Sequence, residues 1–302
     1  MNAIVVSNPR PANAAPGNGP TAPPASRLRT VARRLLKRPA TVTAGVVILL
    51  FVALALLAPL IAPHDPLQSS FMMVRKPPSA LNWLGTDEVG RDVLSRLIWG
   101  TRSSMLAGLI PVVVALLFSV PLGVISGYAG GWVDAVIMRV TDAMLAVPFL
   151  IVAIAMAAFL GPDLWNAMLA IGIAALPIFL RLTRAAALSI KAEDYVEAAR
   201  AVGASPMRIA FRHMLPNMLP PLLVQASVMA AAAIIAEASL SFLGLGQQPP
   251  APSWGSMLNA AQRHMVAAPW MAIAPGAMIF LLVISLNIFG DGLRDALDAK
   301  RR

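Results

Sequence analysis

Six long apolar runs, separated by polar or glycine-rich links, constrain this chain more than any other feature. They cover roughly residues 41–61, 104–128, 133–160, 164–182, 219–243 and 271–289. A helix of about 20 apolar residues is long enough to cross the hydrocarbon core of a bilayer. Only 13% of the 302 residues are charged, and a soluble domain carries about twice that share. The sequence therefore predicts an all-α membrane protein with six transmembrane helices in one domain, residues 39–302.

The residues before the first run, 1–38, differ in composition from the rest. Met1–Ser26 is rich in Pro, Ala, Asn and Gly and lacks the apolar core of a signal peptide, so we expect a disordered tail. Arg27–Arg38 is basic and amphipathic and lies directly before a predicted span. A collar on the membrane surface is therefore favoured over a nucleic-acid patch, although the net charge of the chain is +10.

The distribution of Lys and Arg predicts the orientation in the membrane. Six spans place both termini on the same side as the polar loop between the fourth and fifth spans. Of the 24 Lys and Arg, 18 fall on that side, within residues 1–40, 139, 181–212 and 294–302. Cytoplasmic segments carry the excess of Lys and Arg in membrane proteins. Both termini and the polar loop are therefore predicted to be cytoplasmic.

The stretch of residues 65–101 between the first two spans is too polar to cross a membrane. Thr86 can cap a helix in it, and Asp87 and Glu88 suit a helix N-terminus. Apolar residues lie on one face of that helix (Val89, Val93, Leu94, Leu97, Ile98) and polar residues on the other (Arg91, Asp92, Ser95, Arg96). We expect a short helix along the membrane surface before the second span, with an ordinary loop helix as the alternative.

The polar loop between the fourth and fifth spans has the most informative local pattern. Tyr195–Pro220, YVEAARAVGASPMRIAFRHMLPNMLP, is basic and helical in pattern. Glu193, Asp194 and Glu197 suit the N-terminus of a first helix. Gly203 permits a backbone turn that residues with a Cβ atom resist.

A second helix is predicted to follow this turn. Ser205 and Pro206 combine a capping residue with a proline at the first helical position. Arg208 and Arg212 fall on one side of the helix, and Pro216 is expected to end or kink it where the fifth span begins. The loop is thus predicted to be a helix–turn–helix that meets another protein in the cytoplasm. A hairpin that merely connects two spans is the alternative.

The spacing of residues in this loop resembles a known family. Glu197-Ala198-Ala199, three residues, Gly203 and then Leu215-Pro216 resemble the EAA loop of ABC-importer permeases. The family has Ile where this chain has His213. Residues 84–105, 236–258 and 290–298 resemble the C-type permease subunit of dipeptide, oligopeptide, glutathione and nickel importers. The resemblance covers residues 33–298.

The resemblance implies the type I permease fold of ABC importers and a subunit that forms half of a translocation pathway for peptides or a similar small solute. It implies a second related permease as heterodimer partner, two cytoplasmic ATPase subunits, an extracytoplasmic substrate-binding protein, and the inner membrane of a bacterium. The implied ATPase-coupling loop covers residues 191–216. Its residues are Glu197, Ala198, Ala199, Gly203, Ser205, Pro206, Arg208, Leu215 and Pro216.

Catalytic and cofactor chemistry is not expected on this chain. Nothing in the sequence resembles the GxxxxGK[ST] phosphate loop, so ATP and Mg are expected on the partner ATPases. The chain has no Cys, and His64, His213 and His264 lack metal-ligand spacing. No metal site and no nucleic-acid partner are predicted.

A few residues within the spans are candidates for particular roles. The carboxylate of Glu237 should face a cavity or a partner, because a charge in a span costs on the order of a few kcal/mol. It could line the substrate path and meet a cationic amine, or be a hydrogen-bonded structural carboxylate. Arg139 and Asp142 are expected at the inner interface, where they could pair. Gly123 and Gly127 have the spacing of close helix packing.

Two other classes of function stay open at this point. An ion-coupled secondary transporter would act alone, and acidic and basic residues in repeated halves are typical of it. The sequence shows neither a clear repeat nor an acidic cluster. A non-transporting membrane scaffold would use the loop only to dock a cytoplasmic partner.

Overall fold

The computed structural model describes residues 31–297, and the tail predicted for residues 1–26 lies outside them. The elements of the described part are helices, and its β-type pairing is one isolated bridge between Thr86 and Asp92. The helices are α2 (Pro39–Ile61), η1 (Phe71–Met73), α3 (Val93–Ala129), α4 (Gly131–Leu145), α5 (Phe149–Leu160), α6 (Leu164–Lys191), α7 (Asp194–Ala201), α8 (Pro206–Arg208), η2 (Ile209–Met214), α9 (Leu215–Phe242), α10 (Trp254–Ala261), η3 (Gln262–His264) and α11 (Trp270–Leu297).

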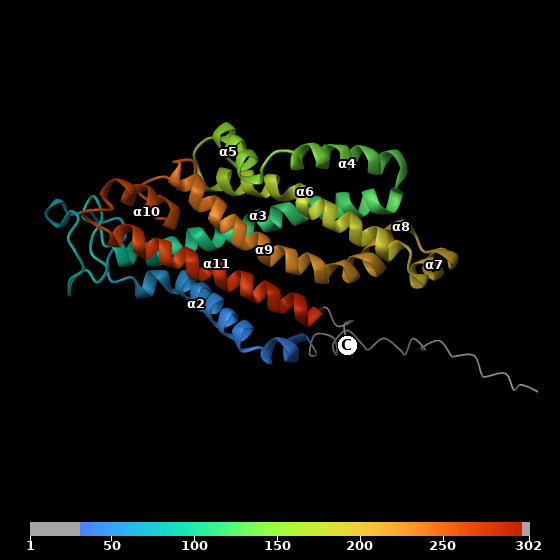
Figure 1. Cartoon of the computed structure of the whole chain (residues 1–302), viewed down its shortest axis with the longest axis horizontal. Coiled ribbons are helices and arrows are strands. Elements are labelled where there is room, and N and C mark those ends of the chain that lie inside the picture. The colour runs from blue at the N-terminus through green and yellow to red at the C-terminus, as the bar shows by residue number, and fades with distance from the viewer. Residues whose placement is uncertain (1–30, 298–302) are drawn as a thin grey trace, which may run out of the picture.

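The long helices lie along one axis of the molecule (Figure 1). Helices α7 and α8 lie at one end of this axis, and α10 lies with the loops of residues 62–92 at the other. Five helices are long and apolar enough to cross a membrane, and α4 with α5 forms a sixth candidate. The predicted all-α membrane fold is confirmed.

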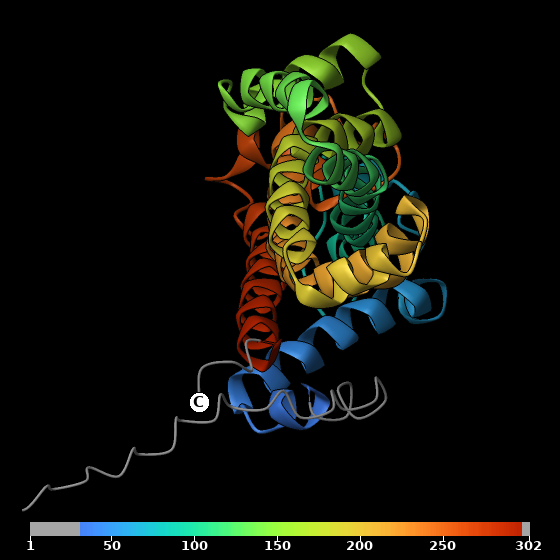
Figure 2. The same cartoon turned by 90° about the vertical axis from the view of Figure 1, so that its right-hand side faces the viewer.

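The first and last long helices meet at their chain-terminal ends. The start of α2 and the end of α11 lie together in both views (Figures 1 and 2). The Arg38 guanidinium contacts the Asp295 carboxylate, and Arg34 Nη1 donates to the Ala296 carbonyl at 3.3 Å. The described part of the basic collar therefore packs on the end of α11.

The third predicted span is not one continuous helix. Helices α4 and α5 meet at an angle of 90° instead of forming a single span over residues 133–160. Pro148 precedes the first residue of α5. Proline has no N–H group to donate to the preceding turn, and it disfavours the helical conformation for Val147 before it. The pattern of hydropathy does not register this break because both helices are apolar.

The prediction of a separate surface helix before the second span is wrong. Asp92, and not Thr86, caps the helix, because its carboxylate accepts from Ser95 N at 2.8 Å. The helix that begins there is α3 itself, which continues for 37 residues. Thr101 and Ser104, where the predicted link ends and the predicted second span begins, are buried within the bundle and do not interrupt the helix.

The polar face of the first turns of α3 is buried and does not face water. Arg96 donates to the carbonyl oxygens of Pro66 at 3.0 Å and Pro250 at 3.2 Å. Its Nε lies 3.4 Å from an Asp87 carboxylate oxygen. The Asp92 carboxylate also accepts from Asn82 Nδ2 at 2.9 Å. These bonds fix the loops of residues 62–92 and 243–253 to α3, which explains why so polar a stretch is ordered.

Glycines bring α3 and α6 into close contact. A Cβ atom added at Gly123 would lie 2.6 Å from Thr183 Cβ, and one at Gly127 would lie 2.6 Å from Ala187 Cβ. Distances this short do not occur between real side chains, so the two helices approach as closely as they do because no Cβ is present. The predicted close packing at Gly123 and Gly127 is confirmed, and α6 is the helix against which they pack.

Replacing Gly127 by Ala should therefore destabilise the fold. The added methyl group would overlap Ala187 Cβ, and overpacking of this kind costs about 1–3 kcal/mol. Gly276→Ala in α11 is the matched control, because nothing lies within 4 Å of the added atom. Thermal denaturation in detergent should show a lower Tm for Gly127→Ala and an equal or higher Tm for the control. Equal Tm values for both variants would contradict close contact between α3 and α6.

Candidate functional site

The first helix of the polar loop ends in a glycine-dependent motif. Helix α7 begins after Glu193, and Asp194 and Glu197 lie in its first turn as predicted. At its end Gly203 has φ +80°. Gly203 N donates to the Arg200 carbonyl and Ala204 N to the Ala199 carbonyl, both at 3.0 Å. These two bonds form a Schellman motif, whose left-handed position favours glycine.

The second helix of the loop starts as predicted, and of the two predicted effects of Pro216, ending or kinking the helix, the ending does not occur. Ser205 Oγ accepts from Arg208 N at 3.4 Å, and Pro206 occupies the start of the helix. Residues Ile209–Met214 then form a π-helical turn, in which Leu215 N donates to the Ala210 carbonyl five residues back. The π turn leads directly into α9, so Pro216 does not end the helix. Pro206–Phe242 is one run of 37 residues.

A buried apolar cluster anchors both helices of the loop to the bundle. Val196 of α7, Ile209, Met214 and Met218 are fully buried, in one cluster with side chains of α3 and α6. On the outer side of α7, Asn217 Nδ2 donates to the Tyr195 hydroxyl at 3.1 Å. Burial and the nearby Glu193 charge raise the pKa of Tyr195, so its hydroxyl stays protonated at neutral pH. The loop is therefore a folded part of the bundle.

Three helix ends meet at one tyrosine that sequence reasoning did not single out. Lys191 Nζ lies 5.5 Å from the centre of the Tyr128 ring and donates to the Tyr128 carbonyl at 2.7 Å. The Arg200 guanidinium carbon lies 5.4 Å from the centre of the same ring. The chain has only two Tyr residues, Tyr128 and Tyr195. A tyrosine at the end of a span was the available signal, but sequence does not say which cations meet it.

The face of the loop that points away from the bundle combines apolar and basic groups. Val202, Met207 and Phe211 are 85%, 69% and 63% exposed. An open groove of about 600 Å³ beside them is lined by Tyr195, Ala198, Ala199, Val202, Ala204, Arg208, Arg212 and His213. Exposed apolar side chains beside a groove are typical of a surface that binds a protein.

The residues of the predicted coupling motif divide between this face and the interior. Glu197, Ala198, Gly203, Ser205, Pro206, Arg208 and Pro216 are exposed, and Ala199 and Leu215 are half-buried. His213, which stands where the family pattern has Ile, lines the groove, and its ring centre lies 6.4 Å from that of Tyr195. Of the motif residues, the groove thus brings together Ala198, Ala199 and Arg208.

Glu237 lies in the interior near the end of α9 that is remote from the loop. It is 1% exposed, and Ser241 Oγ donates to its Oε1 at 2.6 Å. The pocket that α9 lines with Ala226, Ala230 and Ile234 does not include it. Burial together with a hydrogen bond from a neighbouring hydroxyl is what we expect of a structural carboxylate. The role of Glu237 in a substrate path stays a prediction.

Two ion pairs join α4 to α6 at the loop end of these helices. Arg184 binds the Asp134 carboxylate through Nε at 2.5 Å and Nη2 at 2.6 Å, and Ser126 Oγ donates to the same carboxylate at 2.5 Å. Arg181 binds Asp142 at 2.6 Å. The partner of Asp142 is therefore Arg181, and the suggested pair with Arg139 does not form, because α6 offers the nearer cation.

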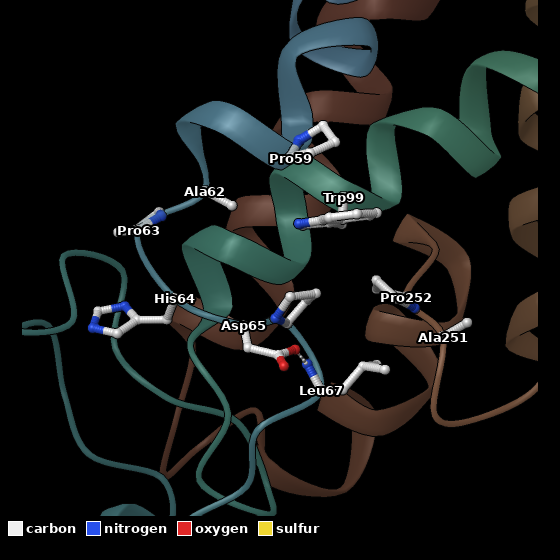
Figure 3. A pocket seen from close by; sticks show the side chains of 10 residues that line it. Pro59, Ala62, Pro63, His64, Asp65, Leu67, Trp99, Ala251 and Pro252 are labelled. Atoms are coloured by element: carbon white, nitrogen blue, oxygen red, sulfur yellow. Dashed lines mark hydrogen bonds between the residues drawn. The ribbon is translucent and has the colours of Figure 1, made fainter.

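A second hollow lies at the opposite end of the molecule. It has a volume of about 650 Å³ and lies between the end of α2, Trp99, and the segment around Pro252 (Figure 3). Asp65 is the acidic residue of its lining, and the Asp65 carboxylate already accepts from Leu67 N at 2.8 Å (Figure 3). Among residues 31–297 no group of three or more metal-ligating side chains is found. The site best developed for binding is thus the loop around α7.

Solved structures with a similar fold include the methionine ABC transporter MetNI in inward-facing conformations. The match has a TM-score of 0.56 at 20% identity and covers 67% of this chain and 95% of that chain. At this identity the similarity concerns the fold alone.

Relatives of known sequence are much closer. A glutathione transport system permease protein of Pectobacterium atrosepticum is 44% identical over 269 residues, 89% of each chain. A di/tripeptide transport system permease protein of Pseudomonas aeruginosa is 47% identical over 258 residues, 83% of this chain and 85% of the relative.

Two family descriptions also match the sequence. Residues 26–78 match the N-terminal TM domain of oligopeptide transport permease C. Residues 119–302, which include the whole loop, match the inner membrane component of binding-protein-dependent transport systems. The chain belongs to this family of inner membrane transport components and is a multi-pass permease subunit of an ABC importer.

Proposed function

We propose that residues 191–216 dock this permease on a cytoplasmic ATPase and carry the movement of the ATPase to the spans. The observation that supports this most directly is the continuity of the second loop helix with α9. Helix Pro206–Phe242 has no break at Pro216, so a force on Arg208 or Phe211 acts directly on the fifth span. A rigid element of this kind transmits rigid-body movement.

The exposed face of the loop suits a protein partner better than lipid. Val202, Met207 and Phe211 would be buried by a partner, and Arg208 and Arg212 would lie beside carboxylates of that partner. Glu197 and Ala198 are exposed next to the same groove, and the small Ala198 side chain lets another backbone approach. A loop that only joined two spans would not need this combination.

The orientation proposed for the chain has the loop and both termini in the cytoplasm. The start of α2 and the end of α11 lie toward the end of the molecule that carries α7 (Figure 1). The same end holds the excess of Lys and Arg, which supports a cytoplasmic position. The hollow near Trp99 and α10 then faces the extracytoplasmic side.

The proposed assembly contains four further subunits. A second related permease would supply the other half of the pathway, two ATPases would bind ATP and Mg, and an extracytoplasmic binding protein would deliver the cargo. We propose small peptides as the cargo class, which the glutathione and di/tripeptide names of the relatives support. Glu237 is proposed to be structural, given its burial and its bond to Ser241.

Vesicle transport tests this function directly. The chain is co-purified with its partner permease and with or without the two ATPases, and reconstituted with the binding protein. Accumulation of labelled glycylglycine and glutathione should require ATP and both ATPases. An ion-coupled secondary transporter would accumulate cargo without them, and a scaffold would accumulate none while still binding the ATPases.

Replacing Gly203 by Val should impair ATPase coupling. A residue other than glycine in the left-handed conformation costs about 1–2 kcal/mol, and Val is among the least tolerant, so we expect about a tenfold loss of uptake. Gly203→Asn should retain most uptake, because Asn accepts this conformation. No atom lies within 4 Å of an added Cβ, so steric overlap does not contribute.

Gly244→Val is the matched control for backbone strain. Gly244 has φ +81° and open space around it, but it lies at the opposite end of α9. ATPase co-purification should fall for Gly203→Val and stay normal for Gly244→Val. Full uptake and normal co-purification in Gly203→Val would remove the loop from the coupling mechanism.

Replacing Glu237 by Gln should leave the selectivity of transport unchanged. Gln keeps an acceptor for Ser241 Oγ, so uptake of glycylglycine and of cationic glycyl-lysine should fall little and by the same factor. Glu237→Leu leaves the buried Ser241 hydroxyl without this acceptor and should lower stability by about 1–3 kcal/mol, measured as Tm. A selective loss of glycyl-lysine uptake in Glu237→Gln would instead place this carboxylate on the substrate path.

A further inference from the structure

We propose that Tyr128 is a positioning residue that makes the coupling helix α7 move together with α3 and α6. The inference rests on the proposed function of the loop and adds the contact by which α7 reaches the bundle. Tyr128 is the next-to-last residue of α3, so its side chain stands at the end of the helix that faces the loop.

Three contacts converge on this residue. Lys191, the last residue of α6, donates through Nζ to the Tyr128 carbonyl at 2.7 Å, and its Nζ lies 5.5 Å from the ring centre. Arg200, in the last turn of α7, has its guanidinium carbon 5.4 Å from the same ring centre. Cations within about 6 Å of an aromatic face are attracted by the ring electrons. The Tyr128 side chain therefore joins the ends of α3, α6 and α7.

Helix α7 contacts other helices on two sides, so the contact between Arg200 and Tyr128 affects how α7 transmits movement. On one side α7 contacts the continuous second helix, through Val196 in the cluster with Ile209 and Met214 and through the bond between Asn217 and Tyr195. On the other side Arg200 reaches Tyr128. Helix α7 thus contacts both the α8–α9 run and the α3–α6 pair, which also pack directly on each other.

The α3–α6 pair is itself a single rigid body at this end. Gly127 of α3 leaves no room for a Cβ against Ala187, and Arg184 of α6 binds Asp134 together with Ser126 of α3. Helix α7 follows α6 after a link of two residues, Ala192 and Glu193. Such a short link limits how far α7 separates from α6 but leaves its rotation to side-chain contacts. The Arg200–Tyr128 contact is placed to fix that rotation.

The test measures ATP hydrolysed per cargo molecule accumulated. The full complex is reconstituted in vesicles, with labelled glycylglycine and glutathione as the two probes. Arg200→Gln removes the cation from an exposed position in a helix. It should raise the ratio of ATP to cargo about threefold, the factor expected for loss of a cation–π contact at an exposed site. Arg200→Lys keeps a cation and should behave like the wild type.

Variants of Tyr128 give the reciprocal measurement. Tyr128→Leu should raise the ratio as Arg200→Gln does, and Tyr128→Phe, which keeps the ring, should restore it. The backbone bond from Lys191 to residue 128 does not depend on this side chain. The double variant should be no worse than Tyr128→Leu alone, because the contact that Arg200→Gln removes is already absent without the Tyr128 ring.

Three results would overturn the proposal. These are an unchanged ratio in Arg200→Gln and Tyr128→Leu, additive losses in the double variant, and loss of ATPase co-purification, which would assign the contact to docking. Failure of the wild-type complex to retain the ATPases would reject the proposed function of the loop instead. The two hypotheses therefore fail by different observations.

Discussion

The contact between α3 and α6 determines where the other parts of the permease lie. Lipid chains are as apolar as the side chains of a span, so burial from water does not hold these helices together within the membrane, and close packing must do so. Gly123 and Gly127 of α3, and Gly172 of α6, each stand where a Cβ would lie less than 3 Å from the facing helix. The pair forms a rod with the loops of residues 62–92 at one end and the loop around α7 at the other (Figure 1).

The polar motifs outside the loop have a structural role in this arrangement. Asp87, Asp92 and Arg96 belong to the stretch 84–105 that carries the family resemblance, and they fix the loops of residues 62–92 to the start of α3. In the stretch 236–258, Ser253 caps α10, and Trp254 Nε1 donates to the Leu97 carbonyl of α3 at 3.1 Å. These residues build the end of the bundle remote from the loop around α7 (Figure 1), and they do not identify the cargo.

Sequence predicted the parts of this fold that depend on local chemistry. The apolar runs predicted the long helices, and Gly203, Ser205 and Pro206 predicted the turn of the loop, since each acts through its own backbone conformation or cap. The start of α3 was missed because the polar face that contains Arg96 is buried by loops distant in sequence. The 90° bend at Pro148 was missed because α4 and α5 together are long and apolar enough to resemble one span. Tyr128 was missed because its partners come from two other helices.

The continuity of the second loop helix with α9 raises the question of how the other spans are moved. A push on the exposed face near Phe211 moves α9 directly, because the π turn over Ile209–Met214 carries the helix past Pro216. In the part of the chain that the structure describes, no single helix joins the α3–α6 pair to the α8–α9 run. If the spans are to move relative to one another, the α3–α6 pair and the α8–α9 run must respond differently to the same partner protein. Helix α7 touches both the α8–α9 run and, through Tyr128, the α3–α6 pair. We therefore infer that α7 and its contact with Tyr128 determine how differently these two sets of helices respond.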